Sequence, residues 1–188
     1  METENTRSAI ARTELSVVVS GVMSDAHTWN LVYLQLLLEE LGHRVVNLGP
    51  CVPGDLLVAE CQWRRPDLIV LSSVNGHGFQ DGLMAIEQLR ASPELADCPV
   101  IIGGKLGVRG AEDGDRSAEL LRAGFDAVFD DSGGVTAFRS FIGSLTKAAL
   151  EPASPHPAAP HPAAPHPVAL EPAAQARAVA ALDAGGAR

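Results

Sequence analysis

Residues 15–38 read LSVVVSGVMSDAHTWNLVYLQLLL, and this stretch decides the fold class. Its first part, Leu15–Val22, is apolar and rich in valine, which is typical of a buried β-strand. From residue 31 onward the leucines recur at helical spacing, and Gly42 follows as a stop signal. The turn between the two patterns contains Asp25-Ala26-His27. The stretch therefore predicts a strand and a helix joined by a turn that carries a carboxylate and an imidazole.

The same alternation of strand and helix continues along the chain. Further apolar runs predict strands at Val45–Leu48, Leu68–Val74, Val100–Ile102 and Ala127–Phe129. Helical patterns follow at Pro53–Trp63, Gly82–Ala91, Arg116–Ala123 and Val135–Ala148. The strands are nearly all apolar rather than alternating, as expected for parallel strands covered on both faces. Five such units predict an α/β fold with a doubly wound five-stranded parallel sheet, flavodoxin-like or Rossmann-like rather than a barrel.

The composition divides the chain into three parts. We expect residues 1–13 to form a flexible N-terminal arm and residues 14–150 to form one domain, a size that can bury a core. Residues 151–188 are rich in Pro, Ala and His and contain the repeat PHPAA from residue 155. Such a segment can pack no core, so we expect a disordered tail. A five-residue period also spreads the imidazoles around a polyproline helix, which argues against a metal site there.

Charge and cysteine content exclude several classes of function. The chain has 14 basic and 23 acidic residues, a net charge of -9, which argues against a nucleic-acid partner. Its cysteines, Cys51, Cys61 and Cys98, form no C-x-x-C pair and are typical of thiols in a reducing compartment. The chain shows neither a signal peptide nor an apolar run long enough to span a membrane. We therefore expect a cytoplasmic protein without a membrane or nucleic-acid partner.

Polar and glycine-rich turns follow the first, third and fourth predicted strands. In a doubly wound sheet, a ligand crevice opens between the loops after the first and third strands, where the strand order reverses. We therefore expect the residues of these turns to converge at one edge of the sheet. The candidate binding residues are Ser24, Asp25, Ala26, His27 and Thr28 from the first turn, Ser72, Ser73, Val74 and Gly76 from the third, and Gly103, Gly104 and Lys105 from the fourth.

Asp25 and His27 form the most informative pair in these turns. A carboxylate two residues before a histidine can hold one ring nitrogen and leave the other free to bind a metal or act as a base. The competing interpretation is that one of the two caps the helix that follows, a role for which aspartate is well suited. The local pattern alone leaves both interpretations open.

The other turns also have plainer interpretations. Ser72 and Ser73 are consistent with hydrogen bonds to neighbouring backbone groups, and Gly103-Gly104 is consistent with an ordinary turn. Gly76 and Gly78 resemble a phosphate-binding loop only weakly, because neither a P-loop nor a complete G-x-G-x-x-G is present. Taken singly, each of these signals is weak.

Their combination resembles a known family. Asp25-Ala26-His27, Ser72-Ser73-Val74 and Gly103-Gly104 follow the order and spacing of D-x-H-x-x-G, S-x-L and G-G, the signature of the cobalamin-binding domain family. The stretch Val45–Gly49 also resembles the second strand of the small, or sigma, subunit of glutamate mutase (methylaspartate mutase). The resemblance covers roughly Leu15–Ile142, which is most of the predicted domain.

The resemblance implies roles for the motif residues. In this family a protein histidine replaces the cofactor's own dimethylbenzimidazole on the cobalt. His27 would be that axial ligand, and therefore the metal-binding residue, with Asp25 as its hydrogen-bond partner. Ser72 would bond the displaced benzimidazole, and Gly103 and Gly104 would leave room for the nucleotide tail.

Two positions depart from the family pattern. Val74 stands where the signature has leucine, which is a mild change of volume. Asn30 stands where the D-x-H-x-x-G motif has glycine. A side chain at this position would either crowd the nucleotide tail or hydrogen-bond to it.

The resemblance implies one subunit of a two-component isomerase. The chain would bind adenosylcobalamin for a carbon-skeleton mutase, glutamate to 3-methylaspartate in the best-matching case. A barrel-type large catalytic subunit would be its partner and would bind the amino-acid substrate. One alternative is a corrinoid protein for methyl transfer, which usually carries a helical cap domain. Another is a flavodoxin-like regulatory module without cobalamin, such as a receiver, which would need an aspartate where the third strand ends in Ser72-Ser73.

Overall fold

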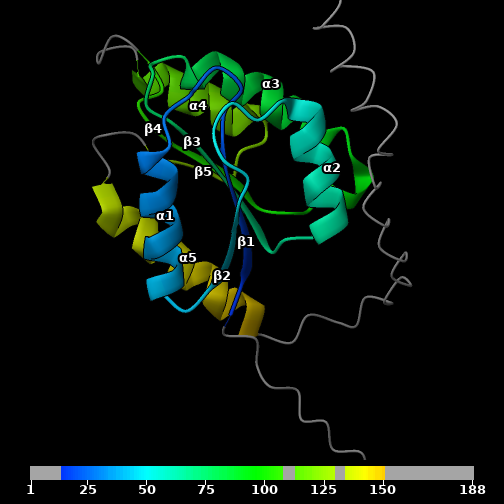
Figure 1. Cartoon of the computed structure of the whole chain (residues 1–188), viewed down its shortest axis with the longest axis vertical. Coiled ribbons are helices and arrows are strands. Elements are labelled where there is room, and N and C mark those ends of the chain that lie inside the picture. Colours follow the sequence, from blue (N-terminus) through cyan, green and yellow to red (C-terminus); the bar gives the residue numbers. More distant parts are fainter. Residues whose placement is uncertain (1–13, 108–112, 130–133, 151–188) are drawn as a thin grey trace, which may run out of the picture. The chain divides into compact units, whose positions relative to one another are not determined.

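The structure is a computed structural model that describes residues 14–107, 113–129 and 134–150 (Figure 1). The flexible arm and the disordered tail expected from the sequence concern residues 1–13 and 151–188, which lie outside the described residues. Within the described part of the chain, no helix is long and apolar enough to cross a membrane.

One parallel sheet forms the centre of the fold. Its strands are β1 (Ser16–Gly21), β2 (Arg44–Asn47), β3 (Leu68–Ser73), β4 (Val100–Gly104) and β5 (Ala127–Phe129). The strand order is β2-β1-β3-β4-β5, and every neighbouring pair is parallel. This confirms the predicted doubly wound five-stranded sheet of the flavodoxin-like class.

In the part of the chain that the structure describes, five α-helices and one short 3₁₀ helix connect and follow the strands. They are α1 (Trp29–Glu40), α2 (Gly54–Arg64), α3 (Gly78–Arg90), the 3₁₀ helix Pro93–Leu95, α4 (Asp113–Ala123) and α5 (Gly134–Leu150). Helix α1 ends as expected before Gly42, whose φ of 87° is unfavourable for other residues.

Helix α3 begins at Gly78, four residues before the predicted start at Gly82. The glycine-rich sequence favours a loop here, but packing against β3 decides otherwise. A Cβ at Gly78 would lie 2.7 Å from the Ser73 Cβ, so glycine lets the first turn of the helix approach the strand closely. The backbone N–H of Phe79 also donates to the Leu106 carbonyl, which ties that turn to the loop after β4.

The helices cover the two faces of the sheet (Figure 1). On one face, α1 and α5 pack their apolar side chains on Val17, Val19 and Val70. On the other, α2, α3 and α4 pack on Val18 and Ile69. Successive residues of a strand thus enter different cores, which explains why the strands are apolar throughout.

The strand order places the carboxyl ends of β1, β3 and β4 side by side. Gly21 at the end of β1 pairs with Ser72, and Ser72 in turn pairs with Gly103 of β4. The chain winds from β1 to β2 on one side and crosses to β3 on the other, so the loops after β1 and β3 diverge at this point. Such a switch point is where open α/β sheets bind ligands.

Candidate functional site

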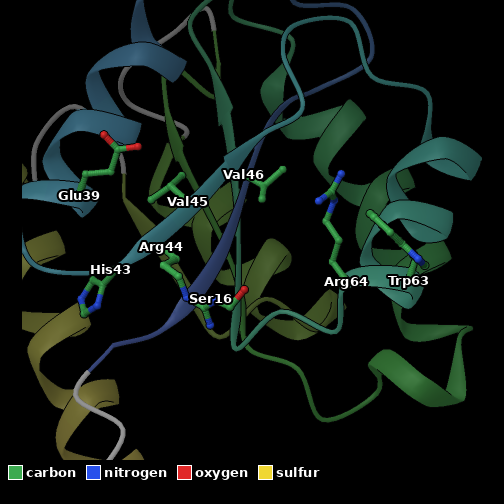
Figure 2. A pocket seen from close by; sticks show the side chains of 8 residues that line it. All are labelled: Ser16, Glu39, His43, Arg44, Val45, Val46, Trp63 and Arg64. Carbon is green, nitrogen blue, oxygen red and sulfur yellow. The ribbon is translucent and has the colours of Figure 1, made fainter. Parts of the chain in front are cut away.

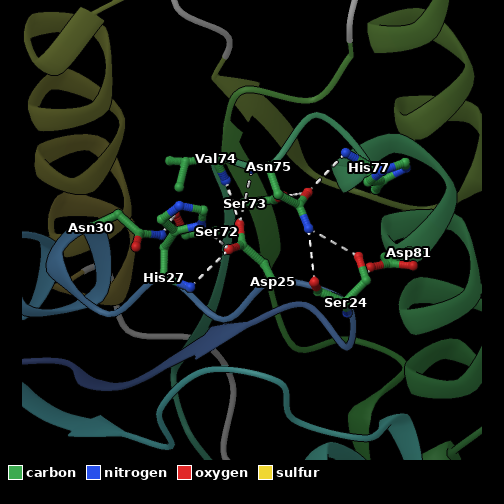
Figure 3. Close-up of polar contacts among 10 residues, drawn as sticks. All are labelled: Ser24, Asp25, His27, Asn30, Ser72, Ser73, Val74, Asn75, His77 and Asp81. Carbon is green, nitrogen blue, oxygen red and sulfur yellow. Dashed lines mark hydrogen bonds and ion pairs between the residues drawn. The ribbon is translucent and has the colours of Figure 1, made fainter.

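Asp25 is the centre of the hydrogen bonding between the loops after β1 and β3 (Figure 3). Its side chain is 1% exposed. Its Oδ1 accepts the backbone N–H of His27 at 2.9 Å and lies 2.6 Å from the His27 Nδ1. Its Oδ2 accepts the backbone N–H groups of Val74 at 2.5 Å and Asn75 at 3.2 Å. One carboxylate therefore joins the two loops that flank the switch point.

These contacts keep Asp25 ionised. Burial alone would raise the pKa of its carboxyl, but hydrogen bonds from the backbone N–H groups of His27 and Val74 outweigh that effect. The contact with the His27 side chain and the nearby Ser73 hydroxyl act in the same direction and bring the pKa to about 2. The site therefore carries a fixed negative charge next to the imidazole.

The lowered pKa predicts a loss of stability in acid. In the unfolded chain Asp25 has its ordinary pKa of 3.8, so below that pH the unfolded state binds a proton more readily than the folded state does. The stabilisation is complete above about pH 5 and is lost as the pH falls toward 2, in total about 2 kcal/mol. Urea unfolding measured across this range should show that the free energy of unfolding falls with pH in the wild type and falls less in Asp25→Asn. Identical pH dependence in both proteins would contradict the assignment.

His27 presents one ring nitrogen outward. Its side chain is 51% exposed, and its Nδ1 is held by Asp25. With the proton on Nδ1 donated to the carboxylate, the lone pair of Nε2 is free to bind a metal. The helix-capping alternative does not hold for α1, because Thr28 is at the N-cap position and no side chain caps the helix.

Asn75, which lies in the turn after the third predicted strand, and Asp81, which no motif in the sequence singles out, make the remaining bonds that hold the two loops together. The Asn75 amide donates to the carbonyl and hydroxyl oxygens of Ser24, at 2.9 and 3.1 Å. Its Oδ1 accepts the Ser73 hydroxyl at 3.0 Å and the backbone N–H of His77 at 2.8 Å. Asp81 accepts the backbone N–H of Ser24 at 3.0 Å. Asp81 is 57 residues from Ser24 in the sequence, so no local pattern marks it.

A cavity of about 290 Å³ lies beside this network, between α1, α5 and the carboxyl ends of the central strands. Its buried polar side chains are Asn30 and Ser72, the exposed Trp29 and Tyr33 add an indole N–H and a hydroxyl, and most of the rest of its lining is apolar. Such a lining suits a flat aromatic group with a few polar atoms. Further lining residues are Val74, Gly103, Gly104, Phe129 and Phe138.

Asn30 reaches across this cavity to β3. Its Nδ2 donates to the Ser72 hydroxyl oxygen at 2.8 Å, and the residue is 5% exposed. Its Oδ1 is buried and has no hydrogen-bond partner among the described residues. Buried acceptors are almost always paired, so an orphaned one calls for a partner that the described residues do not supply.

Gly103 and Gly104 line the cavity, but their own sheet already requires glycine. A Cβ at Gly103 would lie 2.9 Å from the Phe129 carbonyl oxygen. Gly104 has a φ of +100°, and its Cβ would overlap the Ser73 carbonyl oxygen. The resemblance assigns these glycines to the nucleotide tail, and the structure adds a packing role that is independent of any ligand.

Gly104→Ala should therefore destabilise the domain by about 3 kcal/mol, from the left-handed backbone and the overlap together. The matched control is Gly143→Ala in α5, where nothing lies within 4 Å of the added methyl. That change should stabilise the helix by up to about 1 kcal/mol. Urea unfolding of the two variants measures both changes in the free energy of unfolding. If Gly104→Ala left that free energy unchanged, the packing role would be refuted.

The structure does not bring every candidate residue into contact with the cavity. Ser24, Asp25, His27 and Ser73 belong to the hydrogen-bond network rather than to the cavity lining. Gly76 is buried in the loop after β3. Three residues are exposed at the rim of the loops: Ala26, Thr28 and Lys105. The backbone N–H of Lys105 donates to the Ser73 carbonyl at 2.7 Å.

A larger groove, of about 630 Å³, lies elsewhere on the domain (Figure 2). It runs along the edge strand β2 and is lined by charged side chains and Trp63. Its lining includes Ser16 and Arg44, the first residues of β1 and β2, and none of the candidate residues. Because open α/β sheets bind ligands at the carboxyl ends of their strands, the smaller cavity is the better candidate.

The donor set is unsuited to a bare metal ion. Within the described residues, no group of three or more His, Cys, Asp and Glu side chains could hold one. A protein site for a free transition-metal ion usually needs at least three such ligands. A single outward imidazole instead fits a metal whose other positions are filled by a macrocycle, and cobalamin is such a group.

Solved structures confirm the fold. A cobalamin-binding protein from Desulfitobacterium hafniense DCB-2 is 24% identical, with a TM-score of 0.52 over 68% of this chain and 59% of that one. The receiver domain of a histidine kinase from Syntrophus aciditrophicus is 20% identical, with a TM-score of 0.55 over 77% of this chain and 98% of that one. At these identities the likeness shows the fold alone, and cobalamin-binding and receiver domains share it.

Sequence comparison separates the two classes. The family model for the B12 binding domain matches residues 15–131. Glutamate mutase sigma subunit 1 of Haloarcula marismortui is 30% identical over 117 residues, which are 61% of this chain and 75% of that protein. This chain therefore belongs to the B12-binding domain family and is a distant homologue of glutamate mutase sigma subunits.

Proposed function

We propose that this chain is the cobalamin-binding subunit of an adenosylcobalamin-dependent carbon-skeleton mutase. The observation that carries the proposal is the 2.6 Å contact between the His27 Nδ1 and the buried Asp25, which leaves Nε2 free and points the imidazole out of the loop. The homology to glutamate mutase sigma subunits supports glutamate and 3-methylaspartate as the substrate pair.

The described residues fit cobalamin in two places. His27 Nε2 would bind the cobalt, and Asp25 would hold the ring in the tautomer that leaves this nitrogen free. The cavity beside Asn30 and Ser72 would take the base of the displaced nucleotide. When bound, adenosylcobalamin supplies the cobalt–carbon bond whose cleavage starts the rearrangement.

The protein residues would hold and orient the cofactor rather than react with the substrate. The hydrogen bonds of Asp25 and Asn75 fix the two loops against each other before any ligand arrives. This preorganisation favours binding because little further ordering is needed. The amino-acid substrate would bind to a barrel-type catalytic subunit.

A receiver-like function is disfavoured although the fold is shared. Strand β3 ends in Ser72 and Ser73, where a phosphoacceptor would need a carboxylate. Both serines are buried, and Asp25 is committed to four hydrogen-bond contacts within the loops. The site thus offers a free imidazole and no free carboxylate at the position where phosphorylation would require one.

Reconstitution with the catalytic subunit from the same source tests the proposal. We expect the pair to convert glutamate to 3-methylaspartate, followed by proton NMR, only when adenosylcobalamin is present. The His27→Ala variant should lose the activity. Methyl transfer to an acceptor with methylcobalamin, in place of rearrangement, would instead assign the chain to the corrinoid methyl-transfer proteins.

A further inference from the structure

In the buried amide of Asn30, one polar atom has a hydrogen-bond partner and the other has none among the described residues. Its Nδ2 donates to the Ser72 hydroxyl at 2.8 Å, and its Oδ1 has no partner among the described residues. Burying an unpaired acceptor costs free energy, so a hydrogen-bond donor that reaches this oxygen would stabilise the complex. Asn30 lines the cavity and its Oδ1 is closed to solvent, so a ligand that enters there can supply the donor once the amide turns toward it.

Ser72 offers a hydrogen-bond donor beside the unpaired acceptor of Asn30. Its hydroxyl oxygen already accepts from Asn30, and within the described residues its proton is donated to no acceptor. A hydroxyl has one proton to donate, so that proton remains for an acceptor on the ligand. Side by side, the cavity therefore offers a donor at Ser72 and an acceptor at Asn30.

We propose that Asn30 makes this cavity selective for a corrinoid whose lower base carries an amino group next to a ring nitrogen, as adenine does. The ring nitrogen would accept from Ser72, and the exocyclic N–H would donate to the Asn30 Oδ1. This inference rests on the proposed cobalamin-binding function and deepens it, because it names the class of corrinoid that the site takes.

Dimethylbenzimidazole satisfies only half of this pair. Its free ring nitrogen can accept from Ser72, but the base has no N–H group, so the Asn30 oxygen stays orphaned. A site built to hydrogen-bond a ligand group discriminates against an analogue that lacks it, because the buried polar atom is left unpaired. The glycine that the family signature has at this position would make no such distinction.

The test compares two corrinoids that differ only in the amino group. Full-length protein is titrated with adeninylcobamide and with purinylcobamide, and binding is followed by absorption. Both bases coordinate cobalt weakly, so the cost of displacing them is similar and the comparison isolates the amino group. Cobinamide, which has no nucleotide, is the control ligand, and Asn30→Gly is the matched variant, with its fold checked by circular dichroism.

We expect the wild type to bind adeninylcobamide about tenfold more tightly than purinylcobamide, the effect of one satisfied buried hydrogen bond. In Asn30→Gly the two affinities should become equal, while the affinity for cobinamide stays unchanged. Equal affinities of the wild type for adeninylcobamide and purinylcobamide would overturn the inference and leave the proposed function standing. This comparison uses the wild-type protein alone, so it does not depend on the folding of a variant. If none of the three corrinoids binds, the proposed function and the inference both fail.

Discussion

Replacing His27 with alanine is expected to weaken cobalamin binding by about 100-fold or more and to remove the absorption spectrum of a histidine-ligated corrinoid. The reason is that the imidazole is half exposed and held by Asp25 through Nδ1, so it is positioned to give its second nitrogen to the cobalt. An absorption titration of the purified chain, with the spectrum of the bound form recorded at saturation, measures both effects.

The matched control is His77→Ala. This second histidine lies in the neighbouring loop after β3, is exposed, and makes no side-chain cap to α3. Its replacement should leave affinity and spectrum unchanged. Added imidazole should restore binding to His27→Ala in part, because it can fill the ligand position, whereas it cannot repair a misfolded loop. If His27→Ala and His77→Ala lost the same amount of cobalamin affinity, the loss would not come from removing a cobalt ligand.

The second large effect is expected at Asp25. In Asp25→Ala, the backbone N–H groups of His27, Val74 and Asn75 lose their acceptor in a partly buried region of the loops. Charged hydrogen bonds contribute more than neutral ones, and stranded donors add their own cost, so we expect a loss of about 4 kcal/mol in the free energy of unfolding. Urea unfolding measures this loss.

Asp55→Ala is the control for the removal of a carboxylate. Asp55 is exposed in the first turn of α2 and, among the described residues, accepts a hydrogen bond only from the backbone N–H of its neighbour Leu56. Its removal should cost less than about 1 kcal/mol. If Asp25→Ala and Asp55→Ala were equally mild, Asp25 would not be what joins the loops after β1 and β3.

The sequence predicts the sheet well because each strand is covered on both faces. Apolar runs such as Leu68–Val74 can form little other than buried strands when helical patterns alternate with them, and β3 indeed spans Leu68–Ser73. The start of α3 could not be predicted in the same way. Gly78 is an unfavourable helix residue, and it is placed in a helix by the close approach to Ser73, a contact that the local sequence does not contain.

In the site too, contacts between residues close in the sequence could be predicted, and contacts between distant residues could not. The pairing of Asp25 with His27 is predictable because the two residues are two positions apart in one turn, and the structure shows the expected contact. The bond from Asn30 to Ser72 spans 42 residues and that from Ser24 to Asp81 spans 57. The first depends on how α1 packs on β3 and the second on the start of α3, so the sequence could identify Asn30 as unusual without revealing what it contacts.

The most direct test of the account is the electron paramagnetic resonance spectrum of cob(II)alamin bound to protein in which histidine is labelled with ¹⁵N. A nitrogen ligand splits each cobalt line, into three when it is ¹⁴N and into two when it is ¹⁵N. If His27 is the axial ligand, unlabelled protein gives threefold splitting and labelled protein gives twofold splitting. Threefold splitting in the labelled protein would show that the cofactor keeps its own base on the cobalt, and it would contradict the role assigned to His27.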